Sequence, residues 1–203
     1  MSYIGRGILM KAIQSVQLDF IVQTMSNFKY PWFIAGGWSI DLGIGKITRE
    51  HEDIDICIFR ENAQEVLNYF NDWDSYVAIP GEGRLEPCLT INDLKLPRYG
   101  LHLHKGRDFI EILLTDRNED KILFRKNPSI SMNCNQFVRE DILGRKFVAP
   151  EWQLLFKAKE GRIKDEEDFK SYLPFMDKEQ KLWLSSALKE QIPSSSWIEK
   201  LNI

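Results

Sequence analysis

The chain has 203 residues, enough for one large domain or two small lobes with a substantial buried core. Its formal net charge is −3 and its basic residues are spread along the sequence, which argues against an extended nucleic-acid surface and against a polymerase. Three cysteines without paired spacing predict reduced thiols, and no apolar run reaches membrane-spanning length. We therefore expect a cytoplasmic protein without a membrane partner.

The first predicted elements lead to a pair of glycines. Apolar residues recur at helical spacing over residues 11–28, and Pro31 ends that helix. The apolar run 32–35 predicts a strand, Gly36-Gly37 follows it, and residues 39–43 predict a short helix. The N-terminus of a helix behind a glycine turn is a ready anion site, so this turn suits a triphosphate.

Two aspartates lie one residue apart in the next predicted strand, residues 53–59. Because side chains alternate across a strand, we expect Asp53 and Asp55 on one face and Ile54 and Ile56 on the other. Two adjacent carboxylates repel each other, and Mg²⁺ is the cation that prefers carboxylate oxygens while keeping room for water and phosphate. The pair therefore predicts a Mg²⁺ site; the alternative is a solvated strand face beside a simple glycine turn.

A hairpin supplies the third acidic candidate. After a helix predicted over residues 61–70 and an irregular stretch with short strands near 85–89, residues 101–104 and 109–114 predict two strands joined by a turn at 105–108.

Glu111 is a lone acid inside the second, apolar strand of that hairpin, where an isolated carboxylate is costly to bury without a cation or a donor. We expect it to complete the metal site or to accept a proton. Asp108, in the turn, is the second candidate, and a solvated strand face is the alternative for Glu111. His102 and His104 share a strand face with no third ligand placed nearby, which favours a plain hairpin over a zinc site.

The remaining sequence changes from strand-like to helical. A turn at residues 117–120 leads to a short strand at 122–124, Pro150 begins a helix, and two further helices are predicted over 165–173 and 178–188. We expect an α+β fold with a mixed-sheet N-terminal lobe over residues 1–140 and a C-terminal helical lobe over residues 141–203.

The glycine turn and the aspartate strand together resemble the nucleotidyltransferase superfamily that includes DNA polymerase beta. Its signature is a hydrophobic residue, Gly-Gly or Gly-Ser, a spacer, and Asp-x-Asp between hydrophobic residues. The finer string resembles the aminoglycoside and lincosamide nucleotidyltransferases, with nine positions in register: Gly36, Gly37, Trp38, Asp41, Gly45, Arg49, His51, Asp53 and Asp55. The mixed-sheet nucleotidyltransferase fold is what this resemblance implies.

A second block, from Ala149 to Phe169, resembles the same family, in which a lysine-bearing helix precedes a Lys-Asp-x-x-Asp-Phe helix start. Lys157 and Lys159 lie about 200° apart on a helix, so only one of them can face the nucleotide. The resemblance favours Lys157 as the phosphate contact, with a solvated charge as the alternative. For Asp165 and Asp168, capping of the next helix is favoured over a catalytic role.

The resemblance implies Mg²⁺-dependent transfer of a nucleoside monophosphate, from ATP or another NTP, to a hydroxyl of a small molecule. Asp53 and Asp55 would hold the metal, and Glu111 would complete its site or act as the base. Gly36, Gly37 and the helix start at Trp38 and Ser39 would cradle the triphosphate through backbone N–H groups. Arg49 would pair with phosphate oxygens, or else form a surface salt bridge.

The acceptor is left open by the sequence, as is the oligomeric state. Aminoglycosides are polycations, and an acidic cleft with contributions from Glu82, Glu86 and the turn 116–120 would favour them, although surface charge explains these residues equally well. The alternatives are a toxin-type transferase that modifies a protein or a tRNA end, and a degenerate module that binds a nucleotide without turnover.

Overall fold

The computed structural model describes residues 12–159 and 161–202. Within them, the main element is an eight-stranded mixed sheet in the order β10-β11-β1-β2-β6-β5-β3-β4, accompanied by a small sheet in the order β7-β8-β9. The strands are β1 (Trp32–Ile34), β2 (Asp55–Phe59), β3 (Asp74–Ala78), β4 (Leu85–Pro87), β5 (Gly100–Lys105), β6 (Asp108–Thr115), β7 (Arg117–Asn118), β8 (Lys121–Leu123), β9 (Ser131–Asn133), β10 (Val138–Glu140) and β11 (Lys146–Val148).

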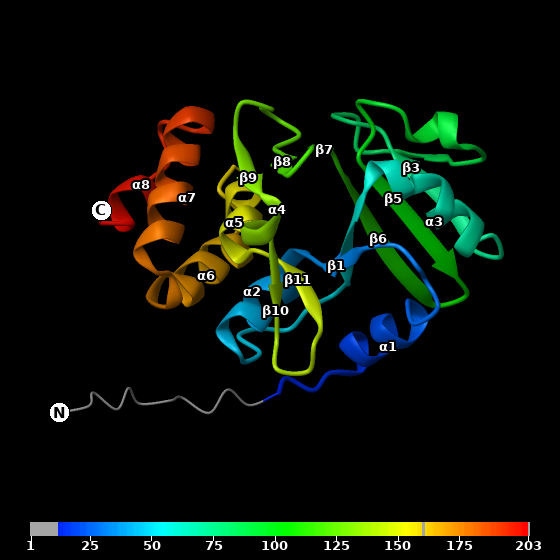
Figure 1. Cartoon of the computed structure of the whole chain (residues 1–203), viewed down its shortest axis with the longest axis horizontal. Helices are drawn as coiled ribbons and strands as arrows, with labels where there is room; N and C mark the ends of the chain where they lie inside the picture. The colour runs from blue at the N-terminus through cyan, green and yellow to red at the C-terminus, as the bar shows by residue number, and fades with distance from the viewer. Residues whose placement is uncertain (1–11, 160, 203) are drawn as a thin grey trace.

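Helices gather mainly at the C-terminal end of the chain, where α5 to α8 lie together on one side of the molecule, opposite β3 and β5 (Figure 1). The helices are α1 (Val16–Thr24), α2 (Gly36–Ile44), α3 (Ala63–Tyr69), α4 (Cys134–Phe137), α5 (Pro150–Lys157), α6 (Ile163–Tyr172), α7 (Lys178–Gln191) and α8 (Trp197–Lys200), with 3₁₀ turns η1 (Arg60–Asn62), η2 (Ile91–Leu94) and η3 (Leu173–Phe175). None of these described helices is long and apolar enough to span a membrane.

The main sheet buries hydrophobic side chains on both faces because helices cover both. Ile56 and Ile58 of β2 point to the face that packs against α1 and α3. Cys57 and Phe59 point to the other face, where they share a core with Trp152 of α5 and with residues of α7. This alternation places Asp55 on the face of Cys57 and Phe59, toward the C-terminal helices.

Local sequence signals explain where several helices begin. The Ser15 side chain accepts a hydrogen bond from the Gln17 amide at 3.2 Å and caps α1, so this helix is shorter than the predicted 11–28; residue 11 lies outside the described residues. Pro150 occupies the first turn of α5, as predicted. Asp177 and Gln180 form a capping box at the start of α7.

The central hairpin agrees with its prediction. β5 and β6 pair antiparallel and close at Lys105 and Asp108, with Gly106 at φ +61° in the turn. Two differences lie around the glycines: α2 begins at Gly36 instead of residue 39, and β2 begins at Asp55 instead of residue 53. β3 was not predicted.

The sheet continues past the expected lobe boundary at residue 140. β11 pairs parallel with β1, Ile34 being opposite Phe147, and antiparallel with β10. The strand Lys146–Val148 is therefore part of the main sheet and not of a separate helical lobe, and the helical region begins at Pro150. The division into lobes as such stays a prediction.

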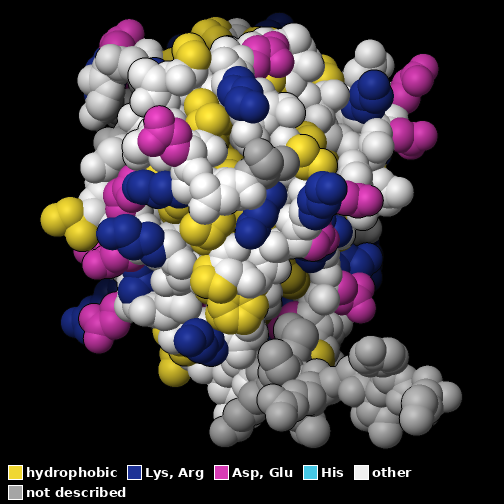
Figure 2. Space-filling view, turned by 90° about the vertical axis from the view of Figure 1, so that its left-hand side faces the viewer, with side chains coloured by type: hydrophobic (Ala, Val, Ile, Leu, Met, Phe, Trp, Pro, Cys, Tyr) yellow, Lys and Arg dark blue, Asp and Glu magenta, His cyan; other side chains and the backbone are white. Residues whose placement is uncertain are grey.

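Charges of both signs alternate on the face formed by the C-terminal helices. Figure 2 shows Lys and Arg side chains beside Asp and Glu side chains there, with hydrophobic side chains between them. This face consequently presents no large field of a single sign.

Candidate active site

Two carboxylates on neighbouring strands form the centre of the candidate site. β2 and β6 run parallel, and their register pairs Asp55 with Glu111. A side-chain hydrogen bond joins the two carboxyl groups. The structure therefore brings Asp55 and Glu111 together on the sheet face that looks toward α5, although the roles predicted for them stay predictions.

This proximity makes the two carboxyl groups titrate differently. Burial, followed by the charges of Glu111 and Asp53, raises the pKa of Asp55 to about 8. Burial acts in the same direction on Glu111, but the interactions with His102 and Asp55 outweigh it and lower the pKa of Glu111. The two carboxyl groups therefore titrate as a pair, with the raised pKa at Asp55 and the lowered pKa at Glu111.

His102 adds a side chain that the sequence analysis did not assign to the site. It lies opposite Glu111 across the hairpin, and 3.6 Å separates its Nε2 from Glu111 Oε1. Counting back from the two-residue turn at Gly106 pairs these residues, so the sequence did contain the signal. His104 lies further along, against the rings of Tyr76 and Phe109.

Asp53 does not share the strand position expected for it. It precedes β2, and its side chain is exposed, so the alternation argument applies to Asp55 alone. Its charge still contributes to the raised pKa of Asp55, which places it near that carboxylate. Asp53 thus stands beside the carboxylate pair, and its metal-binding role stays a prediction.

The glycine turn is built around Gly36. Its φ is +59°, and a Cβ there would lie 1.8 Å from Asp55 Oδ2, so the Asp55 carboxylate packs directly on the bare Cα. Gly37, in contrast, does not have a positive φ. A Cβ on Gly37 would instead lie 2.3 Å from Arg49 Nη2 and 2.7 Å from the His51 ring.

Gln153 connects this turn to α5. The Gly36 amide donates a hydrogen bond of 3.2 Å to Gln153 Oε1, across 117 residues of sequence. Gln153 is buried. Sequence reasoning missed this residue because it lies among apolar residues of α5, where its position resembles any other core position.

The side chains of Trp38 and Ser39 are engaged within the protein. Both are buried; the Trp38 indole N–H donates to Gln17 Oε1 at 3.2 Å, and the Ser39 hydroxyl donates to the Gly36 carbonyl at 2.9 Å. Any contact of these two residues with phosphate would therefore come from the backbone, as the sequence analysis assumed.

A buried clamp fixes the loop between α2 and β2. Asp41 accepts hydrogen bonds from the Thr48 amide at 3.1 Å and from the Thr48 hydroxyl at 2.5 Å, and it lies 2.7 Å from His51 Nε2. The His51 ring also stacks on Trp38, with 4.2 Å between the ring centroids. The motif residues Trp38, Asp41 and His51 thus position the loop that leads to Asp55.

Arg49 and Lys157 both make ion pairs within the protein. Arg49 forms a two-pronged salt bridge with Asp168, with Nε–Oδ1 and Nη2–Oδ2 distances of 2.8 and 3.0 Å. Lys157 Nζ lies 2.8 Å from Asp168 Oδ2 and 3.2 Å from Asp165 Oδ1. Their predicted phosphate contacts remain predictions, and Lys157 also acts on Asp55 through its charge. Lys159, in contrast, is exposed beyond the end of α5.

The capping roles favoured for Asp165 and Asp168 are wrong. α6 begins at Ile163 with Arg162 as its N-cap residue and no capping hydrogen bond from a side chain. Asp165 and Asp168 are almost fully buried, and both form ion pairs with Lys157. They hold α5, α6 and the loop at Arg49 together.

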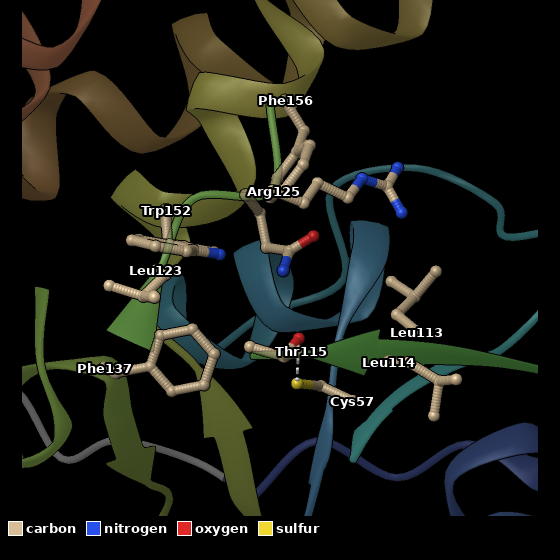
Figure 3. A pocket seen from close by; sticks show the side chains of 10 residues that line it. Cys57, Leu113, Leu114, Thr115, Leu123, Arg125, Phe137, Trp152 and Phe156 are labelled. Carbon is tan, nitrogen blue, oxygen red and sulfur yellow. Dashed lines mark hydrogen bonds between the residues drawn. The ribbon is translucent and has the colours of Figure 1, made fainter. Parts of the chain in front are cut away.

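A hollow lies between the sheet and α5, lined by residues of β2 and β6 that follow Asp55 and Glu111 along their strands (Figure 3). Its volume is about 100 Å³. Figure 3 shows Trp152, Leu123 and Phe137 on one side and Leu113 on the other, with the Cys57 thiol and the Thr115 hydroxyl, 3.1 Å apart, between them. Burial raises the pKa of the Cys57 thiol to about 12, so it stays protonated.

The acidic residues fit a hard divalent cation whose coordination shell is completed by oxygen atoms of the substrate. Among the described residues, no group of three or more His, Cys, Asp or Glu side chains is arranged to hold a metal by itself. Mg²⁺ commonly uses only one or two protein carboxylates together with phosphate oxygens, and Asp55 with Glu111 is such a pair. A cation at this pair would take the place of the shared hydrogen bond, because it too offsets the repulsion between two carboxylates.

Comparisons with known proteins support the fold and the branch suggested by the motif. The family described as aminoglycoside-2''-adenylyltransferase matches residues 17–79. A lincosamide resistance protein of Staphylococcus haemolyticus is 34% identical over 56 residues, which cover 28% of this chain and 35% of that protein. A 2''-aminoglycoside nucleotidyltransferase of Escherichia coli is 33% identical over 57 residues, which cover 28% of this chain and 32% of that protein. The match thus spans about a third of the length of these relatives.

Solved structures extend the likeness over most of the chain. The lincosamide adenylyltransferase LnuA, determined with lincomycin bound, has a TM-score of 0.56 at 22% identity and covers 82% of this chain and 100% of its own. ANT(2'')-Ia in complex with adenylyl-2''-tobramycin has a TM-score of 0.58 at 16% identity, and the likeness covers 87% of this chain and 99% of that chain. The predicted α+β nucleotidyltransferase fold is confirmed, and residues 17–79 carry the sequence pattern of the aminoglycoside and lincosamide branch.

Proposed function

We propose that this protein is a nucleotidyltransferase that moves a nucleoside monophosphate, AMP from ATP, to a hydroxyl group of a small antibiotic-like molecule. The observation that carries the proposal is the pairing of Asp55 with Glu111 on parallel strands, with the Asp55 carboxylate packed against Gly36 at the start of α2. Acidic groups for a cation and a helix N-terminus for phosphates thus lie at one place.

Asp55 and Glu111, with Asp53 beside them, would hold Mg²⁺, which supplies charge neutralisation of the phosphates when bound. The acceptor hydroxyl oxygen attacks the α-phosphorus, and the bond to the pyrophosphate oxygen breaks. Glu111 is ionised and accepts the hydroxyl proton, and His102 at 3.6 Å orients it. The turn at Gly36 and the start of α2 receive the departing phosphates.

The acceptor class rests on the relatives. LnuA was solved with lincomycin and ANT(2'')-Ia with an adenylylated tobramycin. We therefore propose a hydroxyl-bearing antibiotic of the lincosamide or aminoglycoside kind as the acceptor.

The test is product analysis. The purified chain is incubated with Mg²⁺, ATP and either lincomycin or tobramycin, and the products are examined by mass spectrometry for an added AMP. The Asp55→Asn variant is the matched control, and it should give no product. Nucleotide binding without any product, with a broad pool of hydroxyl acceptors included, would contradict transferase activity and indicate a binding module instead.

A further inference from the structure

A second cavity lies between the starts of α5 and α7, beside α4 and the edge strand β10 of the main sheet. Figure 1 shows these three helices next to one another. The cavity has a volume of about 120 Å³, several times the about 10–15 Å³ that a single water requires. Glu151 lines it, whereas Gln153, which serves the glycine turn, lies about 200° further round α5. The cavity therefore lies on a different side of α5 from the candidate active site, and it shares no lining residue with the hollow.

Glu151 brings an unpaired oxygen atom to this cavity. The residue is only 2% exposed, and its Oε1 accepts a hydrogen bond of 3.0 Å from Arg139 Nη2. Its Oε2 is buried as well, but no donor among the described residues bonds to it. A buried carboxylate oxygen without a partner costs free energy, because it has lost its water and gained nothing in return. A ligand that donates a hydrogen bond to Oε2 would remove that cost.

The charges around the cavity favour a ligand with a positive charge. Burial raises the pKa of Glu151 and the charge of Asp177 adds to the rise, so the guanidinium of Arg139 offsets the cost of the buried carboxylate only in part. Asp177 and Glu179 also line the cavity, which sets three carboxylates against that guanidinium. One further positive charge would favour the ionised form of Glu151.

The remaining walls suit an ammonium group better than a metal ion. Trp183 and Met132 line the cavity with an aromatic ring and a thioether. The Trp183 ring stacks on Trp152, with 5.6 Å between the ring centroids, and its indole N–H donates to the Ser131 carbonyl at 3.0 Å, so the ring is held in place. Aromatic rings attract ammonium groups. In the part of the chain that the structure describes, no three His, Cys, Asp or Glu side chains are grouped to hold a metal.

We propose that this cavity binds an ammonium group, either the free ammonium ion or the end of a primary alkylamine. Its N–H groups donate to Glu151 Oε2, and Trp183 forms the aromatic wall beside it. Because the cavity joins α5 to α7 and β10, an occupant stabilises the folded chain in proportion to its concentration and affinity. The site is separate from nucleotidyl transfer and does not depend on the proposed function.

The test is a thermal-unfolding titration of the full chain without nucleotide, at constant ionic strength and at about pH 8, where ammonium groups of the lysine type stay charged. Ammonium and methylammonium chlorides are compared with potassium and tetramethylammonium chlorides, whose cations have the same charge but no N–H group. Glu151→Gln keeps the shape of the side chain and removes its charge. Glu167→Gln is the matched control, because Glu167 is an exposed residue of α6 that does not line the cavity. Gln136→Lys adds a positive charge at an exposed position of the wall.

We expect ammonium salts with N–H groups to raise the unfolding midpoint of the parent chain, while the other two salts do not. Glu151→Gln should weaken the affinity about 10-fold or more, the scale of a lost hydrogen bond to a charged group, and Glu167→Gln should leave it within about 2-fold. Gln136→Lys should weaken it through repulsion. A response to ammonium alone would support the free ion as the occupant, and a response to methylammonium as well would support an amine.

Three results would overturn the site. One is an affinity that Glu151→Gln leaves unchanged, and another is an equal response to potassium. The third is a parent chain whose midpoint no ammonium salt raises. If Glu151→Gln alone then raised the midpoint, the unpaired oxygen would be explained by a proton on Glu151 and not by a ligand.

Discussion

The Asp55 carboxyl group is held in a place where its charge is unfavourable. Its pKa rises from 3.8 to about 8 because it is buried and lies beside Glu111 and Asp53. A carboxyl group with a higher pKa in the folded chain than in the unfolded chain costs stability once the pH exceeds its unfolded pKa, and the cost grows up to about pH 8. The ionised form of Asp55 thus lowers the stability of the fold at neutral and alkaline pH.

Replacing this carboxylate should therefore stabilise the fold while abolishing transfer. We expect Asp55→Asn to raise the unfolding midpoint at pH 8 in metal-free buffer by several degrees, at about 2–4 °C per kcal/mol for a chain of this size, and to give no gain below about pH 4. Asp53→Asn, at an exposed position, should give a smaller gain. A lower midpoint for Asp55→Asn at pH 8, or undiminished Mg²⁺-dependent binding of ATP, would contradict this account.

Gly36 and not Gly37 should be the more sensitive glycine. Gly36→Ala places a methyl group within 1.8 Å of Asp55 Oδ2 at a φ of +59°, so it should cost at least about 1–2 kcal/mol and displace the carboxylate. Gly81→Ala is the control for backbone strain alone, because φ is +78° there and nothing lies within 4 Å. Urea unfolding measures the loss of stability in each variant, and ATP titration measures its nucleotide affinity. Equal effects of Gly36→Ala and Gly81→Ala on ATP binding would show that the turn at Gly36 is not part of the site.

At the scale of elements, the sequence predicted those parts of the site that depend on local pattern. The hairpin of β5 and β6 follows from alternation and from the turn at Gly106, and the start of α5 follows from Pro150. The predicted first residues of β2 and α2 were wrong by two and three residues, respectively. Tertiary contacts, and not local propensity, determine where these two elements begin. The buried roles of Asp165 and Asp168 were missed since their partners come from α5 and from the loop at Arg49.

The salt bridge between Arg49 and Asp168 should hold the loop before β2 onto α6. Asp168→Asn leaves Arg49 and Lys157 with a reduced counter-charge in a buried setting, so we expect a loss of about 3–5 kcal/mol. The matched control is Glu52→Gln, which breaks an exposed 3.5 Å pair with Lys164 between the same loop and the same helix, and should cost no more than about 1 kcal/mol. Urea unfolding measures both, and similar values for the two variants would refute this role of Asp168.

At the scale of the whole molecule, the sheet and the C-terminal helices form one structural unit around the site. β11 lies next to β1 in the sheet, and α5 supplies Gln153 to the glycine turn and Trp152 to the core. The predicted boundary at residue 140 would cut between β10 and β11.

A chain that ends at residue 140 should therefore fail to fold cooperatively. It lacks β11 and α5, and it exposes the face of β2 that carries Cys57 and Phe59 to water. Circular dichroism with thermal unfolding, run beside the full chain, is the measurement. A cooperative transition of the fragment would show that the N-terminal lobe is independent after all.

The long contacts of the glycine turn also have a consequence for the time at which the site can form during synthesis. Gln153, the hydrogen-bond partner of Gly36, is synthesised 117 residues after it, and Asp168, the partner of Arg49, is synthesised 119 residues after it. At about 5–20 residues per second, a ribosome needs roughly 6–24 s to make 119 residues. For that interval the emerging motif is present without the contacts that shape it, so the nascent chain acquires its site among the last features of its biosynthesis.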